Sequence, residues 1–443
     1  MSNMFDNIFL GGLYSDPEVT SILSIETCLM AIIQFETSLA KVEGNIGVIP
    51  KTSARSIQRA LKRIKSGDID SKFVAEDGII IPQLISQIKK KFLADEDSDY
   101  LHWGVTSQDA IDTARCMQLR DFLLVIESRL KSVLQLGAEK ALAYKCLPIA
   151  SRTRGQMASI TSLGAKLAAN FFPILNQRIR LSKLKPNILQ LSLGGSSGTS
   201  NCFGKKYDIL VKELAKDLNL TVPIISWHNN RETFVELASI LTIITSCFGK
   251  FGADIFWMHQ SELQEIELNN VGRSSVMLHK KNPILPEALM ALADINNVLI
   301  SSMNSTMVHR NERDGVAWTK EIIVLKQIMY CTGIACKLGL NLLKIANPRR
   351  DNISRNLERS NGLIFAETAV NHLSSYYNKS DAKRIVSEGI KNVETTNSTL
   401  LVELEKITEK RVDYSEVFDS MKNLGQAPEI VEAFCDKVDH QNF

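Results

Sequence analysis

The most regular pattern in the chain is a stripe of apolar residues between Pro223 and Pro283, an interval without proline. Its members alternate in steps of three and four: Phe234, Leu237, Leu241, Ile244, Phe248, Phe251, Ile255 and Met258. Residues with this spacing share one face of a helix. A stripe this long needs apolar partners along the whole helix, so we expect it to belong to a bundle of long helices.

Other helical patterns flank this interval. Apolar residues with helical spacing run through 295–306 and 318–342, and the segments 120–147 and 164–184 are also typical of helices. Strands do not alternate with helices along the chain, which argues against a doubly wound sheet. We therefore expect an all-α protein with three mainly helical domains: 1–108, 109–350 with the long bundle helices, and 351–443.

Composition and charge narrow the class of protein. The 443 residues are 44% hydrophobic, with 23 Gly and 11 Pro, both below the average shares of about 7% and 5%. Basic and acidic residues nearly balance at 52 and 49, and no basic tail is visible, so we expect no nucleic-acid partner. This composition favours a helical, folded protein over a disordered or repetitive one.

Cysteines and termini bear on the compartment. The eight cysteines form no CxxC pair, and a chain of this size needs no disulfides, so we expect reduced thiols. The N-terminus has no basic residue before Lys41, and the charge-free stretch Leu237 to Gly249 is shorter than a bilayer requires. We expect a soluble, cytoplasmic protein with no membrane partner.

The first candidate site loop is the segment 101–109, LHWGVTSQD. A glycine turn leads into Thr106, Ser107 and Asp109. These residues are typical of a helix N-cap, and a helix N-terminus with free hydroxyl and amide groups also binds anions. Both interpretations remain open from the residues alone.

The second candidate loop is the segment 193–200, LGGSSGTS. It satisfies the GxSxG pattern, which in a hydrolase would make Ser196 a nucleophile on a strand-to-helix turn. The parallel sheet that such a turn requires is missing elsewhere in the sequence. A flexible turn of small residues and a substrate-binding loop both remain possible.

The third candidate loop is the segment 272–283, GRSSVMLHKKNP. It places hydroxyl, imidazole, ammonium and amide groups between two long helices. Lys280 and Lys281 could serve an anionic substrate, and a nearby serine could be activated by their charge. The alternative is a solvated basic loop. We expect no metal, because the seven histidines show no pair at i and i+4.

Taken together, the three loops resemble the signature regions of the fumarase/aspartase superfamily. The third is similar to the family's GSSxMPxKxNP motif, with matches at Ser274, Ser275, Met277, Lys280, Asn282 and Pro283. Within the superfamily, 102–114, LGGSSGT and the segment SWHNNRE are most similar to the bacterial 3-carboxy-cis,cis-muconate cycloisomerases. The resemblance extends from about residue 5 to 440. It implies a homotetramer with a twenty-helix core and active sites that combine loops from three subunits.

The resemblance also implies roles for individual residues. Ser274 would be the general base, which removes a proton next to a substrate carboxylate, and Lys280 and Asn282 would stabilise the dianionic intermediate. The substrate-binding positions would be His102, Thr106, Ser107, Arg154, Gln156, Ser197, Arg231, Ser275 and Met277. No cofactor is implied, and the partner is a small polycarboxylate.

Departures from the family pattern bear on the reaction. Where adenylosuccinate and argininosuccinate lyases carry a histidine general acid in a sequence similar to GRTHxQ, this chain has Arg154. In the signature loop, Arg273 replaces a glycine and Leu278 a proline. The leading hypothesis is a cycloisomerase that converts 3-carboxy-cis,cis-muconate to a carboxymuconolactone. The alternatives are a fumarate-releasing C–N lyase similar to adenylosuccinate lyase, and a catalytically silent helical homologue.

Overall fold

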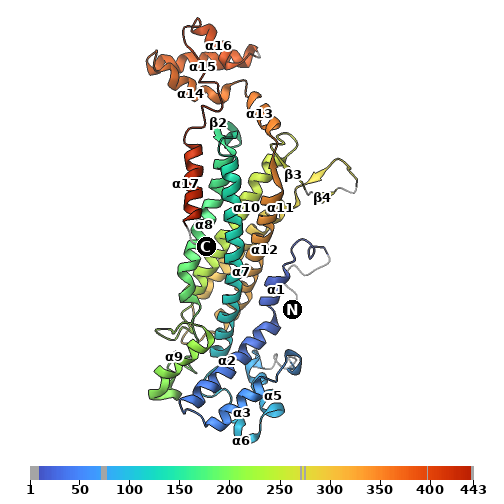
Figure 1. Cartoon of the computed structure of the whole chain (residues 1–443), viewed down its shortest axis with the longest axis vertical. Helices are drawn as coiled ribbons and strands as arrows, with labels where there is room; N and C mark the ends of the chain where they lie inside the picture. The colour runs from blue at the N-terminus through green and yellow to red at the C-terminus, as the bar shows by residue number, and fades with distance from the viewer. Residues whose placement is uncertain (1–8, 71–76, 270–271, 274–275, 397, 441–443) are drawn as a thin grey trace. The chain divides into compact units, whose positions relative to one another are not determined.

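The structure is a computed structural model that describes residues 9–70, 77–269, 272–273, 276–396 and 398–440, and these parts are mainly helical (Figure 1). The long helices are α7 (Ser107–Ala143), α8 (Leu163–Ile188), α10 (Glu232–His259), α11 (Ile284–Asn304) and α12 (Gly315–Ile345). The shorter helices are α1 (Pro17–Ile22), α2 (Ile25–Asn45), α3 (Lys51–Leu61), α5 (Ile81–Phe92), α6 (Asp95–Ser98), α9 (Tyr207–Leu218), α13 (Arg350–Glu358), α14 (Ala366–Leu373), α15 (Lys379–Thr396), α16 (Leu400–Ile407) and α17 (Ala427–Asp439). The 3₁₀ turns are η1 (Ser66–Asp68), η2 (Asn201–Lys206), η3 (Ser305–Met307) and η4 (Leu363–Phe365). The strands are β1 (Pro148–Thr153), β2 (Gln156–Ser162), β3 (Ile266–Leu268), β4 (Gly272–Arg273), β5 (Lys281–Asn282) and β6 (Ala346–Pro348), which form two-stranded antiparallel pairs. The all-α prediction is confirmed.

The apolar stripe forms a helix as its spacing predicts. All eight of its residues lie on α10 and are buried. The predicted runs at 295–306 and 318–342 fall largely on α11 and α12. Helix α7 begins at Ser107, well before the expected start at residue 120, because the polar residues of the loop 101–109 cap its first turn. A search for apolar spacing therefore misses the first turns of a helix when their residues are polar.

Contacts divide the chain into two compact units. Unit 1 comprises residues 1–128, 177–245 and 294–334, and unit 2 comprises 129–176, 246–293 and 335–443. The boundary falls inside each of α7, α8, α10, α11 and α12. These two units are not sequential segments, and the expected domains 1–108, 109–350 and 351–443 stay a prediction. A long helix packs along its whole length, so its two ends belong to different neighbourhoods.

Unit 1 has a core formed by α2, α3, α5 and α9 with the first turns of α7. Phe35 and Leu39 of α2 and Leu84 of α5 are among its buried residues. Helix α2 begins at a standard cap, since the Ser24 hydroxyl accepts a hydrogen bond of 3.0 Å from the Thr27 amide. Leu101 belongs to this core, so the loop 101–109 packs on it at its start, and α2, α3 and α5 are drawn in blue in Figure 1.

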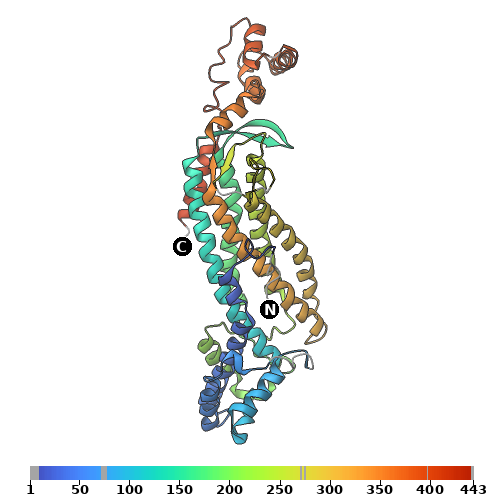
Figure 2. The same cartoon turned by 90° about the vertical axis from the view of Figure 1, so that its right-hand side faces the viewer.

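Unit 2 contains a β-hairpin that helical periodicity did not predict. Strands β1 and β2 pair antiparallel, with Thr153 opposite Gln156, and appear as adjacent arrows in Figure 2. Arg154 and Gly155 form the turn with φ of 52° and 80°. Two consecutive left-handed residues are typical of the tight two-residue turns that fit the twist of a hairpin. The C-terminal helices α14, α15 and α16 enclose a separate small core in this unit.

Helices α10, α11 and α12 are each long and apolar enough to cross a membrane by length and composition alone. The stretch Leu237 to Gly249, which by itself is shorter than a bilayer requires, is thus part of the longer apolar helix α10. In the most apolar stretch of 18 residues in each helix, 61% of the stretch is buried inside the protein for α10 and 72% for α12. For α11 the buried share is 33%. Burial in the bundle accounts for the apolar faces of α10 and α12, whereas α11 keeps an apolar face uncovered.

A buried carboxyl group on α2 makes the stability of unit 1 depend on pH. Glu43 is fully buried, and the described residues offer neither of its oxygens a hydrogen-bond donor. Burial, and secondarily the charge of Glu36, raises the pKa of Glu43 from 4.5 to about 9. The unfolded chain therefore releases this proton at lower pH than the folded chain. Stability falls as pH rises between these two values, by up to about 1.4 kcal/mol per pH unit.

We predict that Glu43→Gln removes this dependence, because the amide has the shape of the protonated acid and cannot ionise. The variant should unfold at a higher temperature than the wild type at pH 8, with little difference at pH 5. Thermal unfolding followed by circular dichroism at both pH values measures this. An equal change at pH 5 and pH 8 would contradict the protonated state of Glu43.

Candidate active site

The predicted site residues are divided between the two units. Unit 1 carries His102, Thr106, Ser107, Ser197 and Arg231. Unit 2 carries Arg154, Gln156, Met277, Lys280 and Asn282. Ser274 and Ser275, the expected base and its neighbour, lie outside the described residues.

Asp109, in the first turn of α7, joins the first two candidate loops. Its side chain is fully buried. Oδ1 accepts hydrogen bonds from the Gly194 amide (2.7 Å) and the Ser192 hydroxyl (3.3 Å) and lies 2.7 Å from His228 Nε2, while Oδ2 accepts from the amides of Gly195 (2.9 Å) and Thr106 (3.0 Å). A buried carboxylate needs several such partners to offset its desolvation. These bonds hold both loops against the start of α7.

Glycines let the two loops approach each other closely. Gly104 has φ of 69°, and a Cβ atom there would lie 2.6 Å from the Phe203 ring. Only glycine fits this combination of left-handed backbone and close contact. The tip of the second loop, with Ser196 and Ser197, remains exposed. This segment leads into the 3₁₀ turn η2 rather than from a sheet strand to a helix, so the structure does not support the hydrolase-type nucleophile at Ser196.

An arginine that the sequence motifs did not single out reaches the first loop. Arg313, just before α12, donates from Nη1 to Thr106 Oγ1 (2.8 Å) and from Nε to Gln108 Oε1 (3.2 Å). It places a positive charge beside Thr106 at the N-terminus of α7, where anions are also favoured. In the sequence, the charged run 309–314 between two predicted helices could have drawn attention to Arg313. Spacing alone does not show that this run contacts α7.

Arg231, which the resemblance makes an anion-binding position, is buried in this structure. Its side chain is fully buried, and its guanidinium donates to both Asp112 (2.8 and 3.2 Å) and Glu321 (2.7 and 2.5 Å). Arg115 also contacts both carboxylates, at 3.1 and 2.8 Å. Because two arginines face two carboxylates, the cluster is neutral overall. Arg231 therefore ties α7 to α12 instead of binding substrate.

The same cluster controls the charge of its acids. Burial alone would raise the pKa of Asp112, but the charges of Arg231 and Arg115 outweigh it and hold this pKa at about 2. The Trp318 indole also donates to Asp112 at 3.0 Å. The guanidinium of Arg231 lies 4.5 Å from the Phe234 ring centroid, an additional favourable contact. The cluster is ionised across the physiological pH range.

In unit 2, the β1–β2 hairpin presents Arg154 and Gln156 at an exposed tip. Arg152 anchors this hairpin through a bidentate pair with Glu265, at 2.9 and 2.6 Å. Glu265 is fully buried, so the pair fixes the base of the hairpin and leaves its turn accessible. Arg154 is available to a ligand, whereas Arg152 is committed to the fold.

The described parts of the third loop are also exposed. Gly272 pairs with Asn282, and the described residues 276–280 between them reach solvent, with Met277 45% and Leu278 94% exposed. Lys280 is exposed, and its amide bonds the Met277 carbonyl at 3.0 Å. Asn282 is held in the short strand β5. The structure thus places Lys280 directly before the strand that contains Asn282, with Lys280 accessible.

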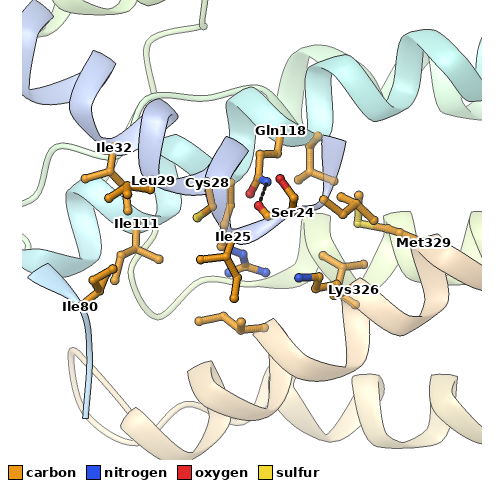
Figure 3. A pocket seen from close by; sticks show the side chains of 15 residues that line it. Ser24, Ile25, Cys28, Leu29, Ile32, Ile80, Ile111, Gln118, Lys326 and Met329 are labelled. Carbon is orange, nitrogen blue, oxygen red and sulfur yellow. Dashed lines mark hydrogen bonds between the residues drawn. The ribbon is translucent and has the colours of Figure 1, made fainter. Parts of the chain in front are cut away.

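A cavity in unit 1 is separate from these residues. It has a volume of about 410 Å³ and is lined mainly by apolar side chains. Figure 3 shows Ser24 and Cys28 from the start of α2 facing Lys326 and Met329 of α12. None of the predicted site residues lines it. Among the described residues, no group of three His, Cys, Asp or Glu side chains could hold a metal ion.

Comparison with known proteins decides the family. Residues 19–295 match the Lyase family. The chain is 31% identical to 3-carboxy-cis,cis-muconate cycloisomerase of Acinetobacter baylyi, over 95% of this chain and 96% of that protein. The chain belongs to the fumarase/aspartase superfamily.

Other members of the fumarase/aspartase superfamily are similar along nearly the same length. N-acetyl-S-(2-succino)cysteine lyase of Enterococcus italicus is 27% identical, over 87% of this chain and 86% of that protein. The crystal structure of the 3-carboxy-cis,cis-muconate lactonizing enzyme from Pseudomonas putida superposes with a TM-score of 0.90 at 27% identity, covering 98% of this chain and 99% of that one. This fumarase/aspartase protein is an enzyme of the cycloisomerase/lyase type.

We predict that Arg231→Met destabilises this fumarase/aspartase enzyme by about 3 to 5 kcal/mol, because it leaves buried carboxylates without a partner. Arg384→Met is the matched control, since Arg384 is 66% exposed in its pairs with Asp381 and Glu388 and such pairs contribute about 1 kcal/mol or less. Urea denaturation of both variants measures the difference. Equal losses in the two variants would contradict a structural role for Arg231.

Proposed function

We propose that this enzyme converts 3-carboxy-cis,cis-muconate to a carboxymuconolactone. The observation that carries the proposal is Arg154 at the exposed hairpin tip, where the resemblance places the histidine acid of the C–N lyases. An arginine does not give up its proton near neutral pH, so it binds a carboxylate rather than serving as a general acid. The similarity to the cycloisomerase of A. baylyi over nearly the whole chain supports the same reaction.

The charges of the candidate site suit a substrate with three carboxylates. Arg154, Lys280 and Arg313 are exposed, and within the described residues none of them pairs with an acidic side chain. Thr106 and Ser107 add hydroxyl groups at the positive end of α7. Cations without an acidic partner attract an anionic ligand and stabilise negative charge that develops on it.

The proposed reaction is an isomerisation in which all atoms are retained. One carboxylate oxygen of the substrate bonds to a carbon of the conjugated double bond. The electrons of that double bond move toward a second carboxylate, which is stabilised as a dianion by Lys280 and Asn282. A proton then adds to the carbon next to that carboxylate. We assign its transfer to Ser274, which regains a proton from water, so the ionised substrate takes up one proton in total. In the reverse direction Ser274 is the base that removes this proton.

We also propose that the active enzyme is a homotetramer. The candidate residues are divided between two units, and the family resemblance implies sites assembled from several subunits. Long helices keep large apolar side chains at the surface, with Val298 of α11 72% exposed and Trp257 of α10 60% exposed. Exposed apolar area on long helices is typical of surfaces that are covered in an oligomer.

A fumarate-releasing lyase is the second candidate. One observation supports it: the similar protein from E. italicus is named N-acetyl-S-(2-succino)cysteine lyase. Such an elimination also begins with removal of a proton next to a carboxylate, so the same residues could support it. The products distinguish the two functions. The lyase splits its substrate and releases fumarate, whereas the cycloisomerase forms a lactone as its single product.

We predict that Lys280→Met lowers kcat for lactone formation by about 100-fold or more, because the developing dianion loses its cation. Ultraviolet absorbance of the conjugated diene follows the reaction. Lys250→Met is the matched control, since Lys250 is an exposed lysine of the same unit that pairs with Asp254. It should retain wild-type activity. Full activity of Lys280→Met or of Ser274→Ala would contradict the assigned roles, and fumarate as product would favour the lyase.

We predict a molar mass in solution equal to that of four chains of 49.4 kDa each. Light scattering coupled to size-exclusion chromatography measures it. Replacing Val298, an exposed apolar residue of α11, by Asp should reduce this mass and lower activity together. A monomer with full activity would contradict a site shared between subunits.

A further inference from the structure

A buried carboxylate outside all of the sequence motifs contacts the first candidate loop. Glu36 lies on α2, and its side chain is 1% exposed. Its Oε1 lies 2.6 Å from Nδ1 of His102, whose side chain is 16% exposed. Both residues belong to unit 1. Helix α2 therefore reaches the candidate site through a single short polar contact.

The contact fixes how His102 presents its ring. A carboxylate only accepts hydrogen bonds, so Nδ1 of His102, when it carries a hydrogen, donates it to Glu36. The other ring nitrogen, Nε2, has no hydrogen-bond partner among the described residues. A ring held through Nδ1 thus offers Nε2 to a ligand, in the way that a supporting carboxylate orients a metal-binding histidine.

The backbone at His102 is held in a strained conformation. Its φ is +62°, in the left-handed region that costs a residue with a side chain roughly 1–2 kcal/mol. Such strain persists only where surrounding contacts over-determine it, and it is common at functional sites. The bond to Glu36 is one of the contacts that can hold this conformation.

The groups around His102 favour its charged form. Burial lowers the pKa of His102, but the charge and hydrogen bond of Glu36 on α2 and the charge of Asp109 on α7 outweigh it. Lys89 on α5 acts in the opposite direction, and the net pKa is raised above 6.5. Glu43, two turns from Glu36 on α2, stays protonated near neutral pH, since its pKa is about 9. Glu36 and Asp109 are therefore the acidic side chains that raise the pKa of His102.

We propose that Glu36 is a positioning residue that fixes the His102 ring and keeps it as an imidazolium, whose Nε2–H group binds a carboxylate of the substrate. The proposal rests on the function proposed above, because it requires an anionic ligand at the loop 101–109. Glu36 touches no substrate itself. Its effect is exerted through the orientation and charge of His102.

Glu36→Gln tests the proposal, because the amide keeps the size of the side chain and removes its charge. Nuclear magnetic resonance of the substrate-free enzyme should show the pKa of His102 falling by about one unit or more. The KM for the muconate should rise about tenfold at pH 8, where the ring becomes neutral, and much less at pH 5.5, with a smaller change in kcat.

Glu43→Gln is the matched control, a change of the same kind on the same helix at a carboxyl group that is already neutral. It should leave both the His102 titration and the pH dependence of KM as in the wild type. An unchanged His102 titration in Glu36→Gln, or a rise in KM that is the same at every pH, would overturn the proposal.

Two further measurements keep the proposal testable in every case. If Glu36→Gln does not fold, His102→Gln replaces it and should show a raised KM at every pH, whereas a wild-type KM would overturn the proposal. If the enzyme does not act on the muconate, citrate binding measured by calorimetry replaces KM. A shifted His102 titration together with weaker citrate binding in Glu36→Gln would then support the positioning role while the proposed reaction fails.

Discussion

Two buried carboxylates on the first turns of α7 organise unit 1. Asp109 accepts hydrogen bonds from two amides of the loop 193–200 and contacts the side chain of His228. Asp112, three residues later, forms ion pairs with Arg231 and Arg115. Removing one partner from such a buried set costs several kcal/mol because the remaining charge has no solvent. The loops are therefore located by charges that face the interior. The residues proposed to meet substrate can remain exposed.

The charges of the protein are divided by function. Arg231 and Arg152 pair with buried carboxylates and serve the fold. Arg154, Lys280 and Arg313 have no acidic partner in the described part of the chain. This division explains how a chain with a net charge of only +3 can still present positive charge to a polycarboxylate. It also explains why an arginine in a conspicuous motif can have a structural role. A guanidinium fits a buried carboxylate pair as well as it fits a substrate.

Much of the fold could be predicted before any coordinates. The apolar steps of three and four identified α10, α11 and α12, because a buried helix face repeats with the helical period. Three polar interruptions identified the candidate loops, and their residues identified the superfamily. The β1–β2 hairpin could not be found in this way. Its turn depends on left-handed backbone at Arg154 and Gly155, which has no apolar period.

Apolar spacing and the loop motifs were enough to predict the helical class, the superfamily and the residue types available to the site. Which of those residues are free to bind substrate depends on how distant segments pack together. The tertiary structure enclosed Arg231, brought Arg313 to Thr106 and placed Glu36 against His102, across separations of up to 207 positions. The reason is physical: periodicity records which face of one element is buried, whereas an ion pair depends on distances between different elements.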